Sequence, residues 1–359
     1  MCASTMWPSE PKTSHAVVFR VEPVRGISPR MTRSVVVATH GHCLDGLASA
    51  ALFTRLLRHV EGTEDLAFKY LSMGYGPGEN GVPDRLLTGD ENVILDYRFS
   101  ANEKLTWYFD HHVSAFATDA ERFAYAGRAE RGKSERFFHD GGYGSCTKLI
   151  ADVGANHFGL DSEPVHELVT WADMIDRAAF PNAKMAVDKS DPVLKLMTVV
   201  EHLGDASFLA KCVPTLLEHG IVALADLPEI RAAYVPFEDQ QRGFVKLVEE
   251  NAQIVGEAVL VDLTKSELDS APKFVTYALY PDRAYSVVVT RSKKKCKLSI
   301  GYNPWCGAPR THDIAKICER HGGGGHPVVG AISLPADDAN AARASELARS
   351  IARELGQPS

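Results

Sequence analysis

The chain has 359 residues, 45% of them hydrophobic, which is enough for a substantial core and favours two domains over one. Its formal net charge of -7 argues against a surface that binds long duplex nucleic acid, although a local basic pocket is compatible with it. The seven cysteines lack the spacing of zinc sites or disulfide frameworks, and no apolar run approaches the roughly 20 residues that span a bilayer. We therefore expect a cytoplasmic protein with no membrane partner.

Residues 1–33 show little periodicity and contain several proline, serine and arginine residues. They lack the apolar core of a signal peptide. We predict a disordered tail without chemical function.

The β-branched run 34–39 is typical of a buried parallel strand. A polar loop with His40, Cys43 and Asp45 follows, and residues 47–59 read as a helix. This order predicts the first unit of a doubly wound sheet. The loop lacks the Lys-Ser/Thr end of a Walker loop. Taken alone, a loop histidine such as His40 is more often a solvent-exposed residue than a functional one.

Two further strands are predicted at 66–71 and 92–95, the second of which ends at Asp96. Asp96 alone would fit a helix cap or a turn. Its position at another strand end, shortly before Asp110, favours a role as a metal ligand.

The segment 107–112 is an apolar run that ends in Asp110, His111 and His112. Open α/β sheets place their chemistry at the carboxyl ends of strands. A solvated loop after an ordinary strand is the alternative for this segment taken alone.

A polar loop is expected up to Asp140. Beyond it, Ser145 would cap a helix that begins at Thr147, and the amides there could face an anion. The apolar element 168–175 carries Asp173, an acid that is costly to bury without a partner or a metal.

Four segments thus each supply an aspartate, and two of them add histidines. Oxygen and imidazole ligands suit Mn²⁺ or a similar divalent ion. Several carboxylates that hold two ions about 3.5–4 Å apart form a clamp for in-line attack on phosphorus. The residue types therefore predict a two-metal phosphoesterase.

The segments HGHCLDG, ILDY, FDHH and WADMID resemble the four signatures of the DHH phosphoesterase superfamily. Arg291-Ser292 and HGGGGHP at 321–327 resemble its DHHA1 companion domain. The resemblance implies an α/β protein with a doubly wound, mainly parallel sheet and a smaller α/β domain with a mixed sheet. We assign 34–228 to the DHH metal-binding catalytic domain, 229–254 to a helical connector and 255–359 to the DHHA1 substrate-binding domain.

The resemblance also implies roles for single residues. One ion would bind His40 and Asp96. The other would bind Asp45, Asp96, His111 and Asp173. Asp110 would orient the first imidazole of the pair, and His112 would contact the scissile phosphate as a charge stabiliser or general acid.

The chain departs from the family pattern at one position. Many members have Asp-x-Asp in the first signature, whereas Cys43 occupies the earlier place here. The departure implies that the first metal site would be weaker, sulfur-liganded or half-empty. Asp173 and Asp176 compete for the last ligand position, and Asp173 is preferred because it precedes an apolar pair as in the family.

The second half begins with helices over 192–227, and the charged amphipathic stretch 229–255 reads as the connector or as one more helix of the first domain. Later segments predict strands and helices in mixed order, which is typical of a smaller α/β domain. The strands are expected at 258–263, 274–280, 285–290, 297–302 and 328–334, and the helices at 313–320 and 336–355.

A glycine run permits close backbone approach, and its amides could cradle phosphate. The predicted phosphate subsite comprises Arg291, Ser292, Gly323, Gly324, Gly325 and His326. The lysines at 293–295 read as a solvated hairpin tip. Trp305 is expected either to stack on a base or to lie in the core.

The leading hypothesis is an enzyme that uses two Mn²⁺ ions, or Mg²⁺ or Co²⁺, to hydrolyse short oligonucleotides, a nucleoside bisphosphate or a cyclic dinucleotide. Long nucleic acid would require an extended basic track. The alternatives are a single-strand exonuclease, a nucleotide-binding regulator with a decayed metal centre, and a hydrolase of pyrophosphate or polyphosphate. A homodimer is compatible with the class.

Overall fold

The computed structural model describes residues 32–75, 81–128, 134–268 and 274–357. Most of the predicted tail lies outside the described residues. Arg33, which was assigned to that tail, is the first residue of strand β1 and pairs with Leu66.

The first of the two sheets consists of five parallel strands in the order β2-β1-β3-β4-β5. These are β1 (Arg33–His40), β2 (Leu66–Met73), β3 (Glu91–Leu95), β4 (Trp107–Asp110) and β5 (Phe137–His139). In the ladder, Thr39 pairs with Leu95, and Leu95 pairs with Phe109. Because the strands are parallel and in this register, the next residues of each strand share one edge of the sheet: His40, Asp96 and Asp110.

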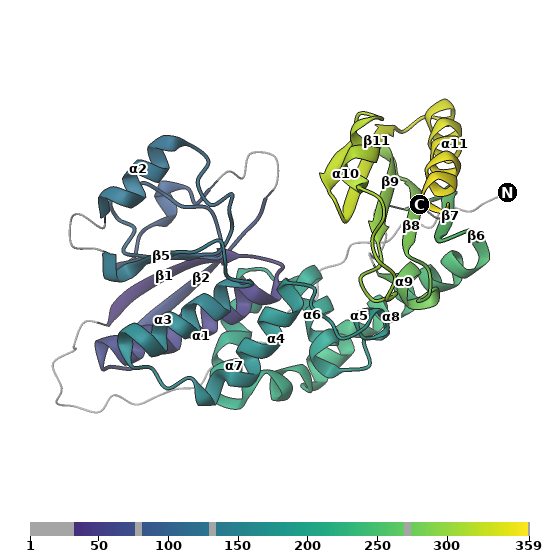
Figure 1. Ribbon diagram of the computed structural model, residues 1–359. Helices are drawn as coiled ribbons and strands as arrows, with labels where there is room; N and C mark the ends of the chain where they lie inside the picture. Colours follow the sequence, from purple (N-terminus) through teal and green to yellow (C-terminus); the bar gives the residue numbers. More distant parts are fainter. Residues whose placement is uncertain (1–31, 76–80, 129–133, 269–273, 358–359) are drawn as a thin grey trace, which may run out of the picture. The chain divides into compact units, whose positions relative to one another are not determined.

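Helices lie on both faces of this sheet (Figure 1). The first-domain helices are α1 (Leu44–Glu61), α2 (Asp119–Arg128), α3 (Cys146–Phe158), α4 (His166–Asp176), α5 (Ala183–Asp188), α6 (Pro192–Leu203) and α7 (Ala206–Ala225). Helix α2 covers one face, and α1 and α3 cover the other. The predicted doubly wound arrangement is confirmed.

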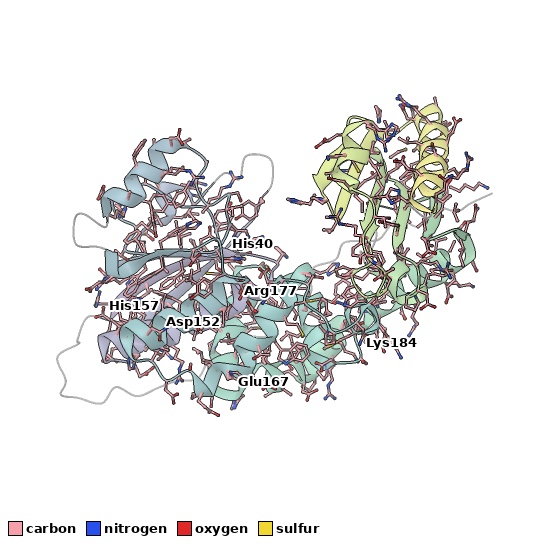
Figure 2. The ribbon with its side chains drawn as sticks, viewed as in Figure 1. His40, Asp152, His157, Glu167, Arg177 and Lys184 are labelled. Carbon is pink, nitrogen blue, oxygen red and sulfur yellow. The ribbon has the colours of Figure 1, made fainter. Side chains whose placement is uncertain are left out.

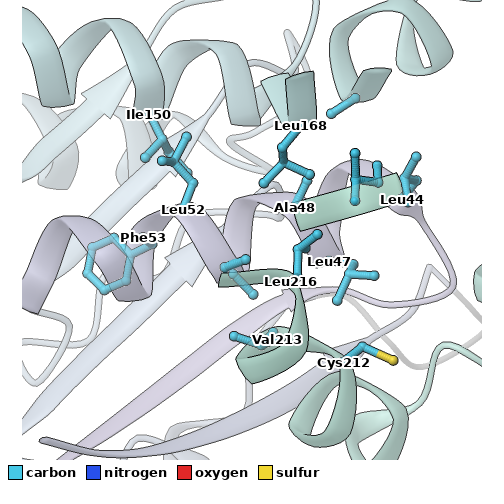
Figure 3. Packing of buried hydrophobic residues seen from close by; sticks show 14 of the residues in the cluster. Leu44, Leu47, Ala48, Leu52, Phe53, Ile150, Leu168, Cys212, Val213 and Leu216 are labelled. Carbon is cyan, nitrogen blue, oxygen red and sulfur yellow. The ribbon is translucent and has the colours of Figure 1, made fainter. Parts of the chain in front are cut away.

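Helix α1 is the centre of the main hydrophobic core because its apolar side chains are buried on several sides. Figure 3 shows Leu47, Leu52 and Phe53 among residues of α3, α4 and α7. The helix ends at Gly62, whose left-handed backbone (φ 62°) lets its amide bond back to the last turn. This packing fixes the amino end of α1, and with it the preceding loop, against the sheet.

Two short elements break the predicted loop before Asp140, namely α2 and β5. The buried Arg128 at the end of α2 donates to the carbonyls of Leu105 and Asn102, and its guanidinium lies over the ring of Phe137. A three-residue strand carries too little periodicity to be recognised from sequence.

Helix α7 corrects the expectation that no apolar run approaches the length of a bilayer. By length and composition it could cross a membrane. Its residues Leu209, Val213 and Leu216 are instead buried in the main core, and Pro214 and Gly220 (φ 82°) interrupt it. Core packing accounts for its apolar composition.

Helix α8 (Pro228–Asn251) contributes to two cores. Ile230 and Tyr234 of its first half belong to the main core. Phe244 and Val248 of its second half pack with strand β7 (Ala258–Glu267). The helix ends earlier than predicted, since 252–255 form a strand. The assignment of 229–254 as a connector between two domains stays a prediction.

The second sheet has six strands in the order β10-β11-β9-β8-β7-β6, with β7 and β8 parallel and the other pairs antiparallel. The strands are β6 (Ala252–Val255), β7 (Ala258–Glu267), β8 (Tyr285–Arg291), β9 (Lys295–Tyr302), β10 (Gly324–His326) and β11 (Val329–Pro335). The helices are α9 (Val275–Leu279), α10 (Ile314–Glu319) and α11 (Asp338–Leu355). The predicted mixed sheet is confirmed, but the strand expected at 274–280 is wrong: the segment forms α9.

Gly46 in the first turn of α1 holds the chain close to the end of β1. A Cβ at this position would lie 1.9 Å from the carbonyl oxygen of His40. We expect Gly46→Ala to lower the free energy of unfolding by about 1–3 kcal/mol, because backbone must move to relieve the clash. Urea denaturation measures the change.

Gly243→Ala in the middle of α8 is the matched control. A Cβ there meets nothing within 4 Å, so the substitution should raise stability by up to about 1 kcal/mol through helix propensity alone. Equal effects of the two substitutions would contradict the close approach at Gly46.

Candidate metal centre

Asp96 is the centre of a polar cluster at the carboxyl edge of the first sheet. Its side chain is 1% exposed, and neither carboxylate oxygen has a hydrogen-bond partner. His40 Nδ1 lies 3.6 Å from Oδ2, while His111 Nε2 lies 3.4 Å and His112 Nδ1 3.6 Å from Oδ1. A buried carboxylate without hydrogen bonds is costly, so this arrangement fits a site built for cations.

The backbone of Asp96 is left-handed, with φ 52°. Its amide donates to the Phe109 carbonyl at 2.9 Å, which ties the turn after β3 to β4. Strain of this kind persists only where the surroundings over-determine it, and it gathers at functional sites. The turn thereby aims the carboxylate between the imidazoles.

Asp45 is held by the amino end of α3. Its carboxylate accepts from the amides of Cys146 (2.8 Å) and Thr147 (3.0 Å). Ser145 caps the helix, as predicted, by accepting from the Lys148 amide. The anion at this helix end is therefore a side chain of the protein, and one of its oxygens stays 3.9 Å from His111 Nε2.

Asp110 orients His112, not His111 as predicted. Its Oδ1 lies 2.7 Å from His112 Nδ1 and accepts from the His111 and His112 amides, and its Oδ2 accepts from the Tyr108 hydroxyl. His111 Nδ1 instead meets the Tyr143 carbonyl at 3.2 Å. Since a carbonyl only accepts, Nδ1 carries the proton in that bond, which leaves His111 Nε2 to bind a metal.

Asp176, rather than Asp173, lies within the cluster beside His111. Asp176 Oδ2 lies 3.3 Å from His111 Nε2. Asp173 accepts from Ser145 and pairs with Arg177 at 3.2 Å (Figure 2 labels Arg177). The ordinary salt bridge satisfies Asp173, so the preference for it is not supported by the geometry.

Three groups of side chains could each hold an ion within the described part of the chain. Within each group the ligand atoms lie within 4.8 Å of one another. The groups are His40, Cys43 and Asp96; Asp96, His111 and His112; and Asp45, His111 and Asp176. Of the predicted metal residues, only Asp173 belongs to none of them.

The charges of the cluster perturb one another. Burial opposes the charge on His111, but its contact with Asp96 and the nearby carboxylates raises its pKa to about 9. Burial and the charge of Asp96 raise the pKa of Asp176 to about 6. Burial, together with the charges of Asp96 and Asp176, also raises the pKa of Asp45 well above its usual range. Crowded carboxylates of this kind are neutralised by protons or by divalent cations.

Tyr75 flanks the cluster, and the sequence reasoning missed it. Its ring centroid lies 5.0 Å from that of His40 and 6.5 Å from that of His112, and the Arg98 guanidinium lies 5.5 Å from it. The residue is 45% exposed, and its ring also packs against that of Tyr97 at a centroid distance of 4.7 Å. The available signal was again a strand end, because β2 stops at Met73.

The loop after β1 is fastened by a distant corner between α6 and α7. The Gly204 carbonyl accepts from the His42 amide at 3.2 Å and from the Ser72 hydroxyl at 3.0 Å. A Cβ on Gly204 would lie 3.0 Å from the His42 backbone, which is left-handed (φ 55°). These contacts fix the shape of the loop that carries His40, Cys43 and Asp45.

The residues of the predicted phosphate subsite lie in an ion pair, a hairpin turn and a short strand. Arg291 pairs with the exposed Asp338 at 2.8 Å, and Ser292 closes the β8–β9 hairpin by bonding to Lys295. The glycine run forms the exposed strand β10, in which Gly324 pairs with Ala331. A role of this run, including Gly323, Gly325 and His326, in substrate binding stays a prediction. Lys293 and Lys294 lie at the hairpin tip as predicted, whereas Lys295 is the first residue of β9.

Trp305 serves packing in this structure. Its Nε1 donates to the Phe180 carbonyl at 2.8 Å, and its ring contacts Phe274 and Tyr277. Of the two expectations for Trp305, the core position describes it better than an open stacking surface.

Comparisons with known proteins find similar folds among solved structures. No family model and no curated protein matches the chain. The pGpG-specific phosphodiesterase PggH from Vibrio cholerae is similar in structure, with a TM-score of 0.61 and 17% identity over 90% of this chain and 98% of that one. RecJ from Thermus thermophilus in complex with Mn²⁺ gives a TM-score of 0.44 and 14% identity over 92% and 53% of the two chains. An exopolyphosphatase-related protein from Bacteroides fragilis gives 0.42 and 12% over 91% and 95%. The likeness to PggH shows that this chain shares its fold, which agrees with the α/β architecture expected from the sequence.

The raised pKa of His111 predicts how the metal-free protein responds to pH. The proton that His111 holds stabilises the folded state fully below pH 6.5, and this contribution is lost as pH rises through about 9. Asp176 acts in the same direction at lower pH, through about 6. We expect Tm of the chelator-treated protein to fall by several degrees more between pH 6.5 and pH 9 than Tm of His111→Gln.

The exposed His219, which lies outside the cluster, provides the control. His219→Gln should leave the pH dependence of the wild type unchanged. Parallel Tm curves for the wild type and His111→Gln would show that no carboxylate raises the pKa of His111.

Proposed function

We propose that this chain, which has the fold of the DHH/DHHA1 phosphoesterases, is a two-metal phosphoesterase that hydrolyses small nucleotides, with linear dinucleotides as its first candidate substrates. The observation that carries the proposal is Asp96, a buried carboxylate whose two oxygens face three imidazoles without a hydrogen bond. Such a group is suited to bridge two cations.

The side chains present fit two divalent ions. His40, Cys43 and Asp96 would hold one, and Asp45, Asp96, His111 and Asp176 would hold the other. When bound, Mn²⁺ or a similar ion supplies Lewis acidity to the scissile phosphate and to the attacking water. The amides of α3 and the Tyr143 carbonyl orient Asp45 and His111 for this task.

His112 is proposed as the group that meets the phosphate. Its hydrogen bond to Asp110 raises its pKa, and its side chain is one-third exposed. Because Nδ1 is engaged by Asp110, the other ring nitrogen is left to donate to a phosphate oxygen or to the leaving group. Asp110 itself is fully buried and acts by holding this imidazole.

The substrate class rests on three observations. PggH, which is described as specific for pGpG, has a similar fold, and the structural alignment with this chain covers almost all of PggH. The partly exposed ring of Tyr75 lies beside His40 and His112, close enough for a base next to the scissile phosphate to contact it. The net charge of -7 disfavours long nucleic acid.

Hydrolysis of labelled pGpG, of 3′-phosphoadenosine 5′-phosphate and of a long single strand, each with Mn²⁺ and with chelator, tests the function. We expect metal-dependent cleavage of the dinucleotide in preference to the long strand. Asp96→Ala should abolish turnover, because it removes the ligand that both ions would share.

Two variants of one helix sharpen this test. Asp176→Asn should lower kcat/KM by about 100-fold or more, whereas Asp173→Asn, its matched control one turn away, should stay within about tenfold of the wild type. Nucleotide binding without turnover would favour a regulator over an enzyme. Equal losses in both variants would contradict the assignment of Asp176.

Gly324 allows a separate test of the second domain as a substrate-binding domain. A Cβ there meets nothing within 4 Å, so Gly324→Val should leave the fold intact. We expect it to raise KM for the dinucleotide by about tenfold while kcat changes little, since the site would lose binding energy only. Gly243→Ala serves as the control. An effect confined to kcat would count against a binding role.

A further inference from the structure

Cys43 occupies a defined place between two sheet-edge ligands. It is the residue before α1, with extended backbone (φ -136°, ψ 137°), and its side chain makes no capping bond to that helix. Its Sγ lies within 4.8 Å of a ring nitrogen of His40 and of a carboxylate oxygen of Asp96. The loop that carries it is fixed by Gly46 against His40 and by Gly204 against His42.

Asp96 supplies an independent sign that an ion belongs beside this sulfur. Its Oδ2, the oxygen near His40, is buried and has no hydrogen-bond partner, and its Oδ1 on the side of His111 is in the same state. The carboxylate thus presents one oxygen to the group with Cys43 and the other to the group with Asp45 and Asp176.

The two halves of the cluster differ in donor chemistry. One half offers sulfur, imidazole and carboxylate; the other offers imidazole and carboxylates only. Thiolate ligands select borderline and soft ions, whereas oxygen ligands suit Mn²⁺ and Mg²⁺. Within a single dinuclear centre, this difference would sort two kinds of ion.

We propose that Cys43 is a metal ligand, so that His40, Cys43 and Asp96 form a thiolate site selective for Zn²⁺, Co²⁺ or Fe²⁺ beside a carboxylate site for Mn²⁺ or Mg²⁺. The inference rests on the proposed metal-dependent function and deepens it by assigning a different ion to each position. Binding replaces the thiol proton by a metal–sulfur bond and releases that proton to solvent; no electron is transferred.

Cobalt absorption tests the proposal without relying on activity. The full chain is freed of metal by chelator, kept reduced and titrated with Co²⁺, first alone and then after saturation with Mg²⁺. A thiolate bound to Co²⁺ produces an intense near-ultraviolet charge-transfer band, which imidazole and carboxylate ligands do not produce. We expect this band to saturate at one Co²⁺ per chain in the wild type.

Three variants assign the sulfur. Cys43→Ser should lose the band and weaken Co²⁺ binding at that position by about tenfold or more. Cys43→Asp, which restores the common family residue, should bind two ions without the band and shift the preference toward Mn²⁺. Cys306→Ser, which removes a partly exposed thiol elsewhere, should keep the band.

The wild-type spectrum alone can refute the proposal. The test therefore remains decisive even if a variant fails to fold. A wild-type protein that binds Co²⁺ without a charge-transfer band, or a band retained in Cys43→Ser, refutes ligation by Cys43. Hydrolysis without the band would leave the proposed function standing and this inference refuted. If the band is present but no nucleotide is hydrolysed, ligation by Cys43 would be supported and the proposed function refuted.

Discussion

The site depends on one buried carboxylate that makes no hydrogen bond to the protein. Asp96 lies in a left-handed turn, its two oxygens lack hydrogen bonds, and three imidazoles surround it at 3.4–3.6 Å. Most of the neighbouring groups can be understood as supports for this arrangement. Asp110 holds His112, the Tyr143 carbonyl holds His111, and the amides of α3 hold Asp45. Each support removes rotational freedom from a side chain of the cluster.

Parallel topology makes this concentration of charge feasible. Three adjacent strands end in register, so ligands that are far apart in sequence converge without long side chains. The hydrophobic residues of α1 are buried in the main core and thereby hold the loop after β1 in place. The packing energy of the core, rather than contacts among the polar groups, therefore offsets the cost of bringing several carboxylates together.

Strand ends and motifs made most of the fold and of the candidate ligands predictable from sequence. The choice between Asp173 and Asp176 was not, because both lie near the end of one helix, and only the position of Arg177 and Ser145 shows that Asp173 is already paired. The partner of Asp110 depends on the conformation of a two-residue turn, which residue types do not specify. Tyr75 carries no motif, and α9 replaces a predicted strand because its five residues are too few for either periodicity to be distinctive.

The tie between the loop after β1 and Gly204 has a consequence for the order of folding. The carbonyl that fastens His42 and Ser72 belongs to a residue more than 130 positions later in the chain than Ser72. Contacts of such sequence separation form only after a large loop has closed. During synthesis the strand β1 and helix α1 emerge early, but their shared loop cannot reach its final shape until the corner between α6 and α7 has been made. The nascent amino-terminal half should therefore be unable to form the proposed metal centre, and any binding of ions would follow, not guide, the assembly of the first domain.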